Sequence, residues 1–285
     1  MAGRAKRVRG GKTASAGGRE LSTPIINHPS SFINPDAFTL IELLVVISLI
    51  VLLMAVLLPT LGRARKQARA VACQAKLRQW GLVFSMYVED SDRQYPLEEI
   101  PRINVWQLSL RPYCSDSNDI LLCPMATRYE ENENDPYPAD KRYLGSKYTA
   151  WKHSFFVGNG PAYGGTYYGS YGLNNLVALR GGYTAQTPLL LDCASGGVFP
   201  HPTDGPPAFD GQLVAGEGHM SWVCIDRHQG GIDALFCGMT VRKVGLKELS
   251  TLNWHPEWDT ANRWTKAGGV QPEDWPAWMR GFKDY

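Results

Sequence analysis

One long apolar segment constrains the fold more than any other feature of this chain. Residues Thr39 to Leu58 form a run of about 20 residues, broken only by Glu42 and Ser48. A helix of that length covers about 30 Å, the thickness of the hydrocarbon core of a bilayer. The run is longer and richer in Leu, Val and Ile than the apolar region of a signal peptide, and no small-x-small cleavage pattern follows it. We therefore predict a membrane-spanning helix that stays in the protein.

The helix is expected to continue beyond the membrane. Pro59 would kink the helix rather than end it, because apolar side chains recur beyond it at three-, four- and seven-residue steps. They form one stripe, which consists of Leu61, Ala64, Ala68, Val71, Ala75, Leu82 and Met86. Mostly off this stripe lie the basic residues Arg63, Arg65, Lys66 and Arg69. The pattern predicts a helix of about fifty residues from Phe38 to near Glu89, apolar all round at first and then amphipathic.

Changes of composition suggest the domain boundaries. Residues 1–37 are rich in Gly, Ser, Pro and basic residues without apolar periodicity, which is typical of a disordered leader. The long helix divides into a transmembrane part, 38–58, and an amphipathic part, 59–90. A globular head at 91–246 and a Trp-rich segment at 247–285 complete the chain, which with 285 residues can bury a real core.

Short β-prone segments bounded by Gly or Pro predict a small antiparallel sheet in the head. These segments are Thr187–Cys193, Met220–Ile225, Ile232–Cys237 and Met239–Val244. The last two would form a hairpin that turns near Gly238, and the segment 106–114 is predicted to be a short helix. One face of such a sheet needs a cover, which the amphipathic half of the long helix would supply. The expected fold class is therefore α+β with irregular loops.

The cysteines and tryptophans leave alternatives open. Six cysteines without a C-x-x-C pair are too few for a disulfide scaffold. Cys114 and Cys123 flank one short loop and are the first disulfide to test, with buried free thiols as the alternative. The tail contains Trp254, Trp258, Trp264, Trp275 and Trp278. These rings are expected to pack on the sheet as a C-terminal wrap, although an aromatic surface for carbohydrate is the other interpretation.

Chemical motifs are weak throughout the chain. Asp226, Arg227 and His228 could be imagined as acid, anchor and base, but no H-E-x-x-H, G-x-S-x-G or G-x-x-x-x-G-K-[ST] pattern occurs. We expect Arg227 and His228 to bond backbone carbonyls at the start of a strand. No diagnostic spacing for a metal site is found among His201, His219, His255, Asp204 and Asp210. The prediction is a non-enzyme without catalytic residues, cofactors or metal ligands, and a net charge of +2 gives no argument for a nucleic-acid partner.

The segment "AFTLIELL" after a basic leader resembles the start of type IV pilins and of the pseudopilins of bacterial type II secretion. The resemblance implies a pilin-like fold and cleavage by prepilin peptidase between Ala37 and Phe38, followed by methylation of the new Phe38 amine. Glu42 then becomes the acid at the fifth mature position. The family strongly prefers Gly before the cut, where this chain has Ala37, so slower processing is expected.

This resemblance gives the carboxylate of Glu42 a role. An acid within a membrane costs roughly 2.5 kcal/mol or more, so it usually has a partner or a function. In a filament the amine of one Phe38 can lie next to Glu42 of a neighbouring subunit, and the attraction fixes the register of assembly. The other interpretation is an interfacial residue that reaches back to the lipid headgroups.

A second resemblance covers Asp226 to Leu249, "DRHQGGIDALFCGMTVRKVGLKEL". This segment is similar to the Arg-His-x-Gly-Gly sequence and closing hairpin of pilin-like proteins abundant in planctomycetes and related bacteria. Those relatives usually have Asp, and often Gly and His next, where this chain has Gly238, Met239 and Thr240. The missing Asp weakens any metal role for this hairpin.

Together these features imply a structural subunit that is cleaved, methylated and assembled into a secretion pseudopilus or a pilus-like filament. Its expected partners are further copies and related pilin subunits, the prepilin peptidase, the inner-membrane assembly platform and the membrane. The resemblance places the N-terminus in the bacterial cytoplasm and the head in the periplasm, whereas the basic residues nearest the span favour the opposite orientation. The alternatives are a membrane-tethered periplasmic protein that binds glycans through its Trp-rich tail, and a tethered hydrolase based on His228.

Overall fold

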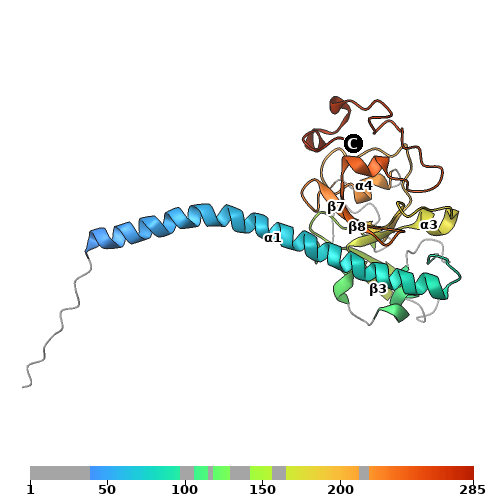
Figure 1. Ribbon diagram of the computed structural model, residues 1–285, viewed down its shortest axis with the longest axis horizontal. Coiled ribbons are helices and arrows are strands. Elements are labelled where there is room, and N and C mark those ends of the chain that lie inside the picture. The colour runs from blue at the N-terminus through green and yellow to red at the C-terminus, as the bar shows by residue number, and fades with distance from the viewer. Residues whose placement is uncertain (1–38, 97–105, 115–117, 129–141, 156–164, 212–217) are drawn as a thin grey trace, which may run out of the picture. The chain divides into compact units, whose positions relative to one another are not determined.

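The computed structural model describes residues 39–96, 106–114, 118–128, 142–155, 165–211 and 218–285 (Figure 1). The chain divides into two compact units, residues 1–54 and 55–285, and each is described by itself. Ala37 and Phe38, between which cleavage is predicted, lie outside the described residues.

Helix α1 spans Leu40–Asp90 and contains 51 residues, with Pro59 in its interior. The prediction of one continuous helix through this proline is confirmed. Every residue from Leu40 to Arg69 is exposed. Among the described helices, α1 is the one long and apolar enough to cross a membrane.

The inner face of α1 differs from the predicted stripe. Its large buried side chains are Cys73, Leu77, Trp80, Val83 and Phe84. Four of them recur at steps of four, three and four residues, which places them along one side of the helix. They pack against Tyr171, Leu173, Leu189, Leu190 and Leu235. The prediction that the stripe through Val71, Leu82 and Met86 covers the sheet is wrong. The side with Trp80 and Phe84 packs there instead, because these rings bury more apolar area than scattered aliphatic side chains do.

The main sheet has five strands. They are β4 (Tyr171–Asn174), β5 (Pro188–Asp192), β6 (Gly197–Val198), β7 (Gly231–Phe236) and β8 (Val241–Gly245), in the order β6-β4-β5-β7-β8. The strand predictions for β5, β7 and β8 are confirmed, and β7 and β8 form the predicted antiparallel hairpin. The sheet is mixed rather than purely antiparallel, because β6 runs parallel to β4.

One strand prediction is wrong. Met220–Ile225 does not join the sheet; its first part forms the short helix α4 (Met220–Val223). Gly218 adopts a φ of 77° just before it, and the amides of Ser221 and Trp222 bond back to the carbonyls of Gly218 and His219. Local backbone bonds therefore replace a strand partner in this segment.

A second, three-stranded antiparallel sheet lies in the region where the sequence shows no clear pattern. Its strands are β1 (Arg142–Tyr143), β2 (Trp151–Phe155) and β3 (Gly165–Gly169). The short helix predicted at 106–114 is confirmed as α2 (Trp106–Leu110), continued by the 3-10 turn η1 (Arg111–Tyr113). The head also contains the short helices η2 (Asn118–Leu121) and α3 (Asn175–Arg180).

The two faces of the main sheet bury two cores. The second half of α1 covers one face. The other face is covered by α4 and by the C-terminal segment with its turns η4 (Lys247–Thr251), η5 (Pro272–Asp274) and η6 (Ala277–Met279) (Figure 1). Trp254, Trp258 and Trp275 are buried in this second core, and Trp264 and Trp278 pack against it. The head is therefore a three-layer arrangement, with α1 and the C-terminal segment on opposite sides of the sheet.

Candidate functional site

Glu42 forms part of the start of helix α1. Its carboxylate accepts hydrogen bonds from the Thr39 amide at 2.9 Å and the Thr39 hydroxyl at 2.7 Å, and the Glu42 amide donates to Thr39 Oγ1 at 3.2 Å. This reciprocal pattern is a capping box, which a Thr-x-x-Glu sequence before an apolar run can indicate. The sequence analysis missed this local role. The pairing of Glu42 with the Phe38 amine stays a prediction, because Phe38 lies outside the described residues.

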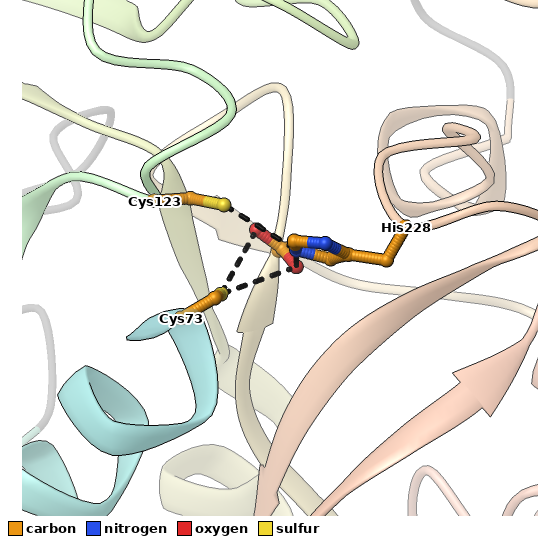
Figure 2. Close-up of side chains that lie close together, drawn as sticks. Cys73, Cys123 and His228 are labelled. Carbon is orange, nitrogen blue, oxygen red and sulfur yellow. Dashed lines mark hydrogen bonds and ion pairs between the residues drawn. The ribbon is translucent and has the colours of Figure 1, made fainter. Parts of the chain in front are cut away.

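Four polar side chains from distant parts of the chain meet inside the head. They are Cys73 on α1, Cys123 after η2, Asp192 at the end of β5 and His228 before β7. One ligand-type atom of each lies within 4.8 Å of the others (Figure 2). Cys73, Cys123 and Asp192 are fully buried and His228 is 4% exposed. The four side chains are thus shielded from solvent.

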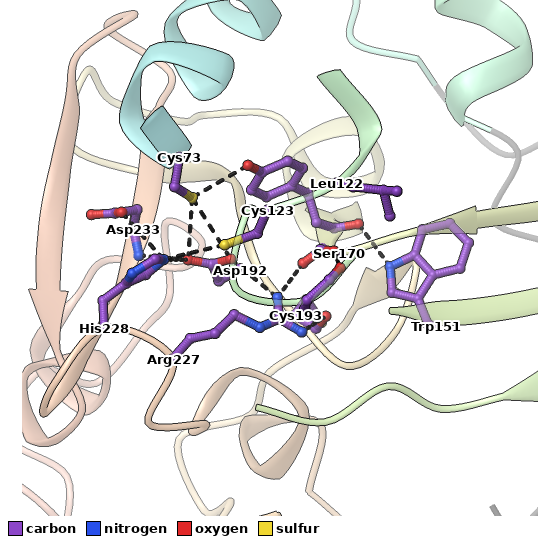
Figure 3. A network of polar contacts seen from close by, with 12 residues as sticks. Cys73, Leu122, Cys123, Trp151, Ser170, Asp192, Cys193, Arg227, His228 and Asp233 are labelled. Atoms are coloured by element: carbon purple, nitrogen blue, oxygen red, sulfur yellow. Dashed lines mark hydrogen bonds and ion pairs between the residues drawn. The ribbon is translucent and has the colours of Figure 1, made fainter. Parts of the chain in front are cut away.

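Asp192 lies at the centre of the polar contacts. Its Oδ1 accepts from Arg227 Nη1 at 3.1 Å. Its Oδ2 accepts from the Asp233 amide at 2.9 Å and lies 3.0 Å from His228 Nε2. Both carboxylate oxygens are therefore held in place, with Oδ2 facing the cluster (Figure 3).

Arg227 is buried and anchors this arrangement to the backbone. Its guanidinium donates to the carbonyls of Ser146, Ser170 and Cys193, which confirms the prediction that Arg227 bonds backbone carbonyls. His228 differs from that prediction. Its Nε2 lies 3.4 Å from Asp233 Oδ2 and 3.4 Å from Cys123 Sγ, and its buried Nδ1 has no hydrogen-bond partner among the residues that the structure describes.

The two thiols close the other side of the cluster. Cys73 Sγ lies 3.2 Å from the Tyr171 hydroxyl and 3.7 Å from Asp192 Oδ2. Cys114 and Cys123, the first pair to test for a disulfide, are not bridged, which is the alternative that the sequence left open. The Cys114 thiol donates to the carbonyl of Leu110, whereas Cys123 points inward to His228.

The electrostatics of the cluster couple its members. Burial opposes the ionisation of Asp192, but His228 and Arg227 lower its pKa to about 2. Burial would lower the pKa of His228, yet its hydrogen bonds with Asp192 and Cys123 raise that pKa to about 10. Burial, together with the nearby Asp192 carboxylate, raises the pKa of Asp233. These shifts describe a dry site where each charge depends on its neighbours.

The thiols respond to the same surroundings. Burial and the hydrogen bond to Cys123 raise the pKa of Cys73 well above its usual value. Burial disfavours the thiolate of Cys123 as well, but hydrogen bonds with Cys73 and His228 lower its pKa overall. Thiolates are the form in which cysteines bind metals, so the surroundings favour a ligand at Cys123.

A cavity of about 310 Å³ lies beside the cluster; His228 belongs to both, and Arg227 lines the cavity as well. Arg63, Lys66 and Lys243 also line it, so all charged side chains in its described lining are basic. This cavity is suited to an anion, whereas the buried cluster is rich in acidic and sulfur groups.

The other residues considered from the sequence have local partners. Asp204 accepts the amides of His201 and Met220, and Asp210 pairs with Lys147 at 3.3 Å. Nδ1 of His219 accepts the Phe199 amide. Within the described ranges, the group of side chains that could hold a metal is the Cys73, Cys123, Asp192 and His228 cluster. Of these four, sequence reasoning considered His228 as a possible base and Cys123 as one half of a disulfide to test, and it gave no role to Cys73 or Asp192.

No protein-family model, curated protein or solved structure matches this chain. By its fold, the protein is of the α+β class and has a long N-terminal helix that is apolar enough to span a membrane.

Proposed function

We propose that this protein is a pilin-like structural subunit that polymerises through helix α1. In this proposal the segment up to Leu58 anchors the precursor in the inner membrane, and prepilin peptidase cleaves before Phe38 and methylates its amine. The inner-membrane assembly platform then adds the subunit to a secretion pseudopilus or a pilus-like filament. The observation that supports it best is a second apolar row on α1.

The second row is exposed. Leu61, Val71, Leu82 and Met86 are 47%, 58%, 68% and 45% exposed, and the small residues Ala64, Ala68 and Ala75 between them are also exposed. At about 100° per residue, this row lies roughly opposite the row of Cys73, Leu77, Trp80 and Phe84 that packs on the sheet. Helix α1 therefore has two apolar faces, and the head covers one of them.

An uncovered apolar row on a helix favours a partner helix. The row continues the apolar span without a break in the helix, so a partner that buries it must also run alongside the membrane segment. A second copy of α1 meets this requirement because it presents the same row over the same length. The alanines would let two such helices approach closely, as small residues do between membrane helices.

A tethered monomer has no use for this row, which favours the filament over the alternatives. The glycan-binding alternative is further weakened because Trp254, Trp258 and Trp275 are buried in the core. A hydrolase based on His228 is disfavoured as well, since His228 is 4% exposed and its Nε2 faces Asp192.

The capping box supports a precise position for the Glu42 carboxylate. Thr39 holds one carboxylate oxygen at the beginning of the helix, close in sequence to the amine that cleavage before Phe38 would create. In the proposed filament, the amine of the next subunit pairs with this carboxylate and sets the stagger between helices.

Two measurements test the proposal. Mass spectrometry of the N-terminal peptide from membranes should find methylated Phe38; a chain that keeps the leader uncut would refute the processing step. For assembly, Val71→Cys should yield oxidative crosslinks between subunits. Arg69→Cys is the matched control, since Arg69 is exposed on the same helix but lies off the row. Equal crosslinking at both positions would contradict packing through this row.

A further inference from the structure

We propose that Cys73, Cys123, Asp192 and His228 bind one zinc ion inside the head. The inference goes beyond the filament proposal and does not depend on it, because all four residues belong to the unit of residues 55–285.

The distances among the four side chains fit a tetrahedral ion. Zn–S bonds of about 2.3 Å and Zn–N or Zn–O bonds of about 2.0 Å place neighbouring ligand atoms about 3.3–3.8 Å apart. Cys123 Sγ lies 3.4 Å from His228 Nε2, and Cys73 Sγ lies 3.7 Å from Asp192 Oδ2. His228 Nε2 and Asp192 Oδ2 are 3.0 Å apart and need to separate by only a few tenths of an ångström. Three of the six ligand–ligand distances are thus within a few tenths of an ångström of those in a tetrahedral zinc site, and all four atoms lie within 4.8 Å of one another.

The set of donor atoms favours zinc over harder cations. Two sulfurs, one imidazole nitrogen and one carboxylate oxygen are ligands that zinc accepts together, whereas Ca²⁺ and Mg²⁺ prefer oxygen throughout. On binding, the two thiols and the imidazolium of His228 each release one proton to solvent, and the neutral imidazole then coordinates through the Nε2 lone pair. Four protein ligands in a closed interior are typical of a structural zinc site rather than a catalytic one.

The groups around the four ligands are arranged as supports for them. Arg227 holds Oδ1 of Asp192, and the Asp233 amide holds Oδ2 on the side that faces the cluster. The Tyr171 hydroxyl lies 3.2 Å from Cys73 Sγ and can donate to the thiolate. Gln74 donates to Asp233 Oδ1 at 2.9 Å and orients that carboxylate beside the site. Such outer contacts orient metal ligands in known sites.

The charges around the site are balanced before an ion binds. Asp192 and Asp233 lie against the basic Arg227 and His228, and the two thiols are neutral while they are protonated. On binding, the two positive charges of the ion offset the two thiolates, so the buried site gains no large net charge.

A zinc ion here would tie together four separate segments. Cys73 comes from α1, Cys123 from the loop after η2, and Asp192 and His228 from the ends of the central sheet. The ion would therefore fasten the long helix to the sheet it covers, at the first fully buried position of that helix.

A disulfide between Cys73 and Cys123 is the competing arrangement. It would use the two sulfurs but would give no role to the convergence of His228 and Asp192 on the same point. The two arrangements exclude each other, which makes them easy to distinguish.

The test uses the full chain in detergent, stripped of metal under reducing conditions and refilled. We expect about one zinc per chain, and cobalt in its place should give visible ligand-field bands and a near-ultraviolet thiolate-to-cobalt band. Cys73→Ser and Asp192→Asn should each weaken zinc binding by about 100-fold or more, since changes in outer-shell residues already cost about 10- to 100-fold. Cys224→Ala, at a buried cysteine outside the cluster, should leave binding unchanged.

Three outcomes would overturn the zinc site. The first is a wild-type chain that takes up no zinc and shows no thiolate-to-cobalt band. The second is unchanged affinity in the folded Cys73→Ser and Asp192→Asn variants. The third is a disulfide between Cys73 and Cys123 in protein whose free thiols were alkylated as the cells were broken. Because the first and third outcomes are read on the wild-type chain, the proposal can fail even if a variant does not fold.

Discussion

Replacing Arg227 with Met should destabilise the head strongly. The substitution keeps a long side chain in the core but removes the guanidinium that bonds Asp192 and the carbonyls of Ser146 and Cys193. Ser170 O keeps the amide of Cys193 as a donor, so this carbonyl is not left unpaired. The loss therefore falls on a buried carboxylate and on the carbonyls of Ser146 and Cys193.

The size of the effect follows from these contacts. Removing one partner of a buried ion pair costs about 3–5 kcal/mol, and an unpaired buried carbonyl adds about 1–3 kcal/mol. With one ion pair and two carbonyls affected, we expect the free energy of unfolding to fall by at least about 5 kcal/mol, a large part of the roughly 5–15 kcal/mol available to a domain. For a head of this size the melting temperature would fall by at least about 10 °C.

The assay is urea unfolding of the full chain in detergent, followed by tryptophan fluorescence, which reports on the buried Trp80 and Trp254. Arg242→Met is the matched control. The Arg242 side chain is 41% exposed and pairs with Glu248 at 2.7 Å, so its loss should cost no more than about 1 kcal/mol. If the two variants unfold at the same urea concentration, the anchoring role of Arg227 is refuted.

Three further predictions concern assembly and metal binding. Leu82→Asp should abolish filaments but change the free energy of unfolding of the head by no more than about 0.5 kcal/mol, because Leu82 is 68% exposed. If it destabilises the head as much as Trp80→Ala does, Leu82 does not face outward. Glu42→Gln keeps a side chain that can form the capping box but removes the charge, so the yield of filaments should fall while cleavage continues. If Glu42→Gln gives the full yield of filaments and Glu42→Ala does not, Glu42 serves only to cap the helix. Free zinc at 100 times its dissociation constant should stabilise the folded head by about 2.7 kcal/mol. Removing that zinc should therefore lower the melting temperature of the head by about 5–11 °C. An identical melting curve with and without chelator would count against a structural ion.

Local patterns in the sequence were enough to predict the features that depend on neighbours in the chain. The apolar run and its amphipathic continuation predict the uninterrupted helix through Pro59, because helical bonds join residues only four apart. The hairpin of β7 and β8 follows from two adjacent β-prone segments and a tight turn. The capping box was also present in the sequence, as Thr39 and Glu42, and only its structural meaning was overlooked.

Tertiary structure decided everything that depends on which face meets which neighbour. Two apolar rows on α1 are possible from spacing, and only the packing of Trp80 and Phe84 on the sheet shows which row is inside. The β-prone residues of α4 are helical because the amides of Ser221 and Trp222 bond locally, to the carbonyls of Gly218 and His219. The cluster of Cys73, Cys123, Asp192 and His228 joins four segments whose separations along the chain match no known motif, so the sequence pattern could not predict it. Contacts between residues distant in the chain are set by the fold, and this buried site exists only once the helix, the loop and the sheet are packed together.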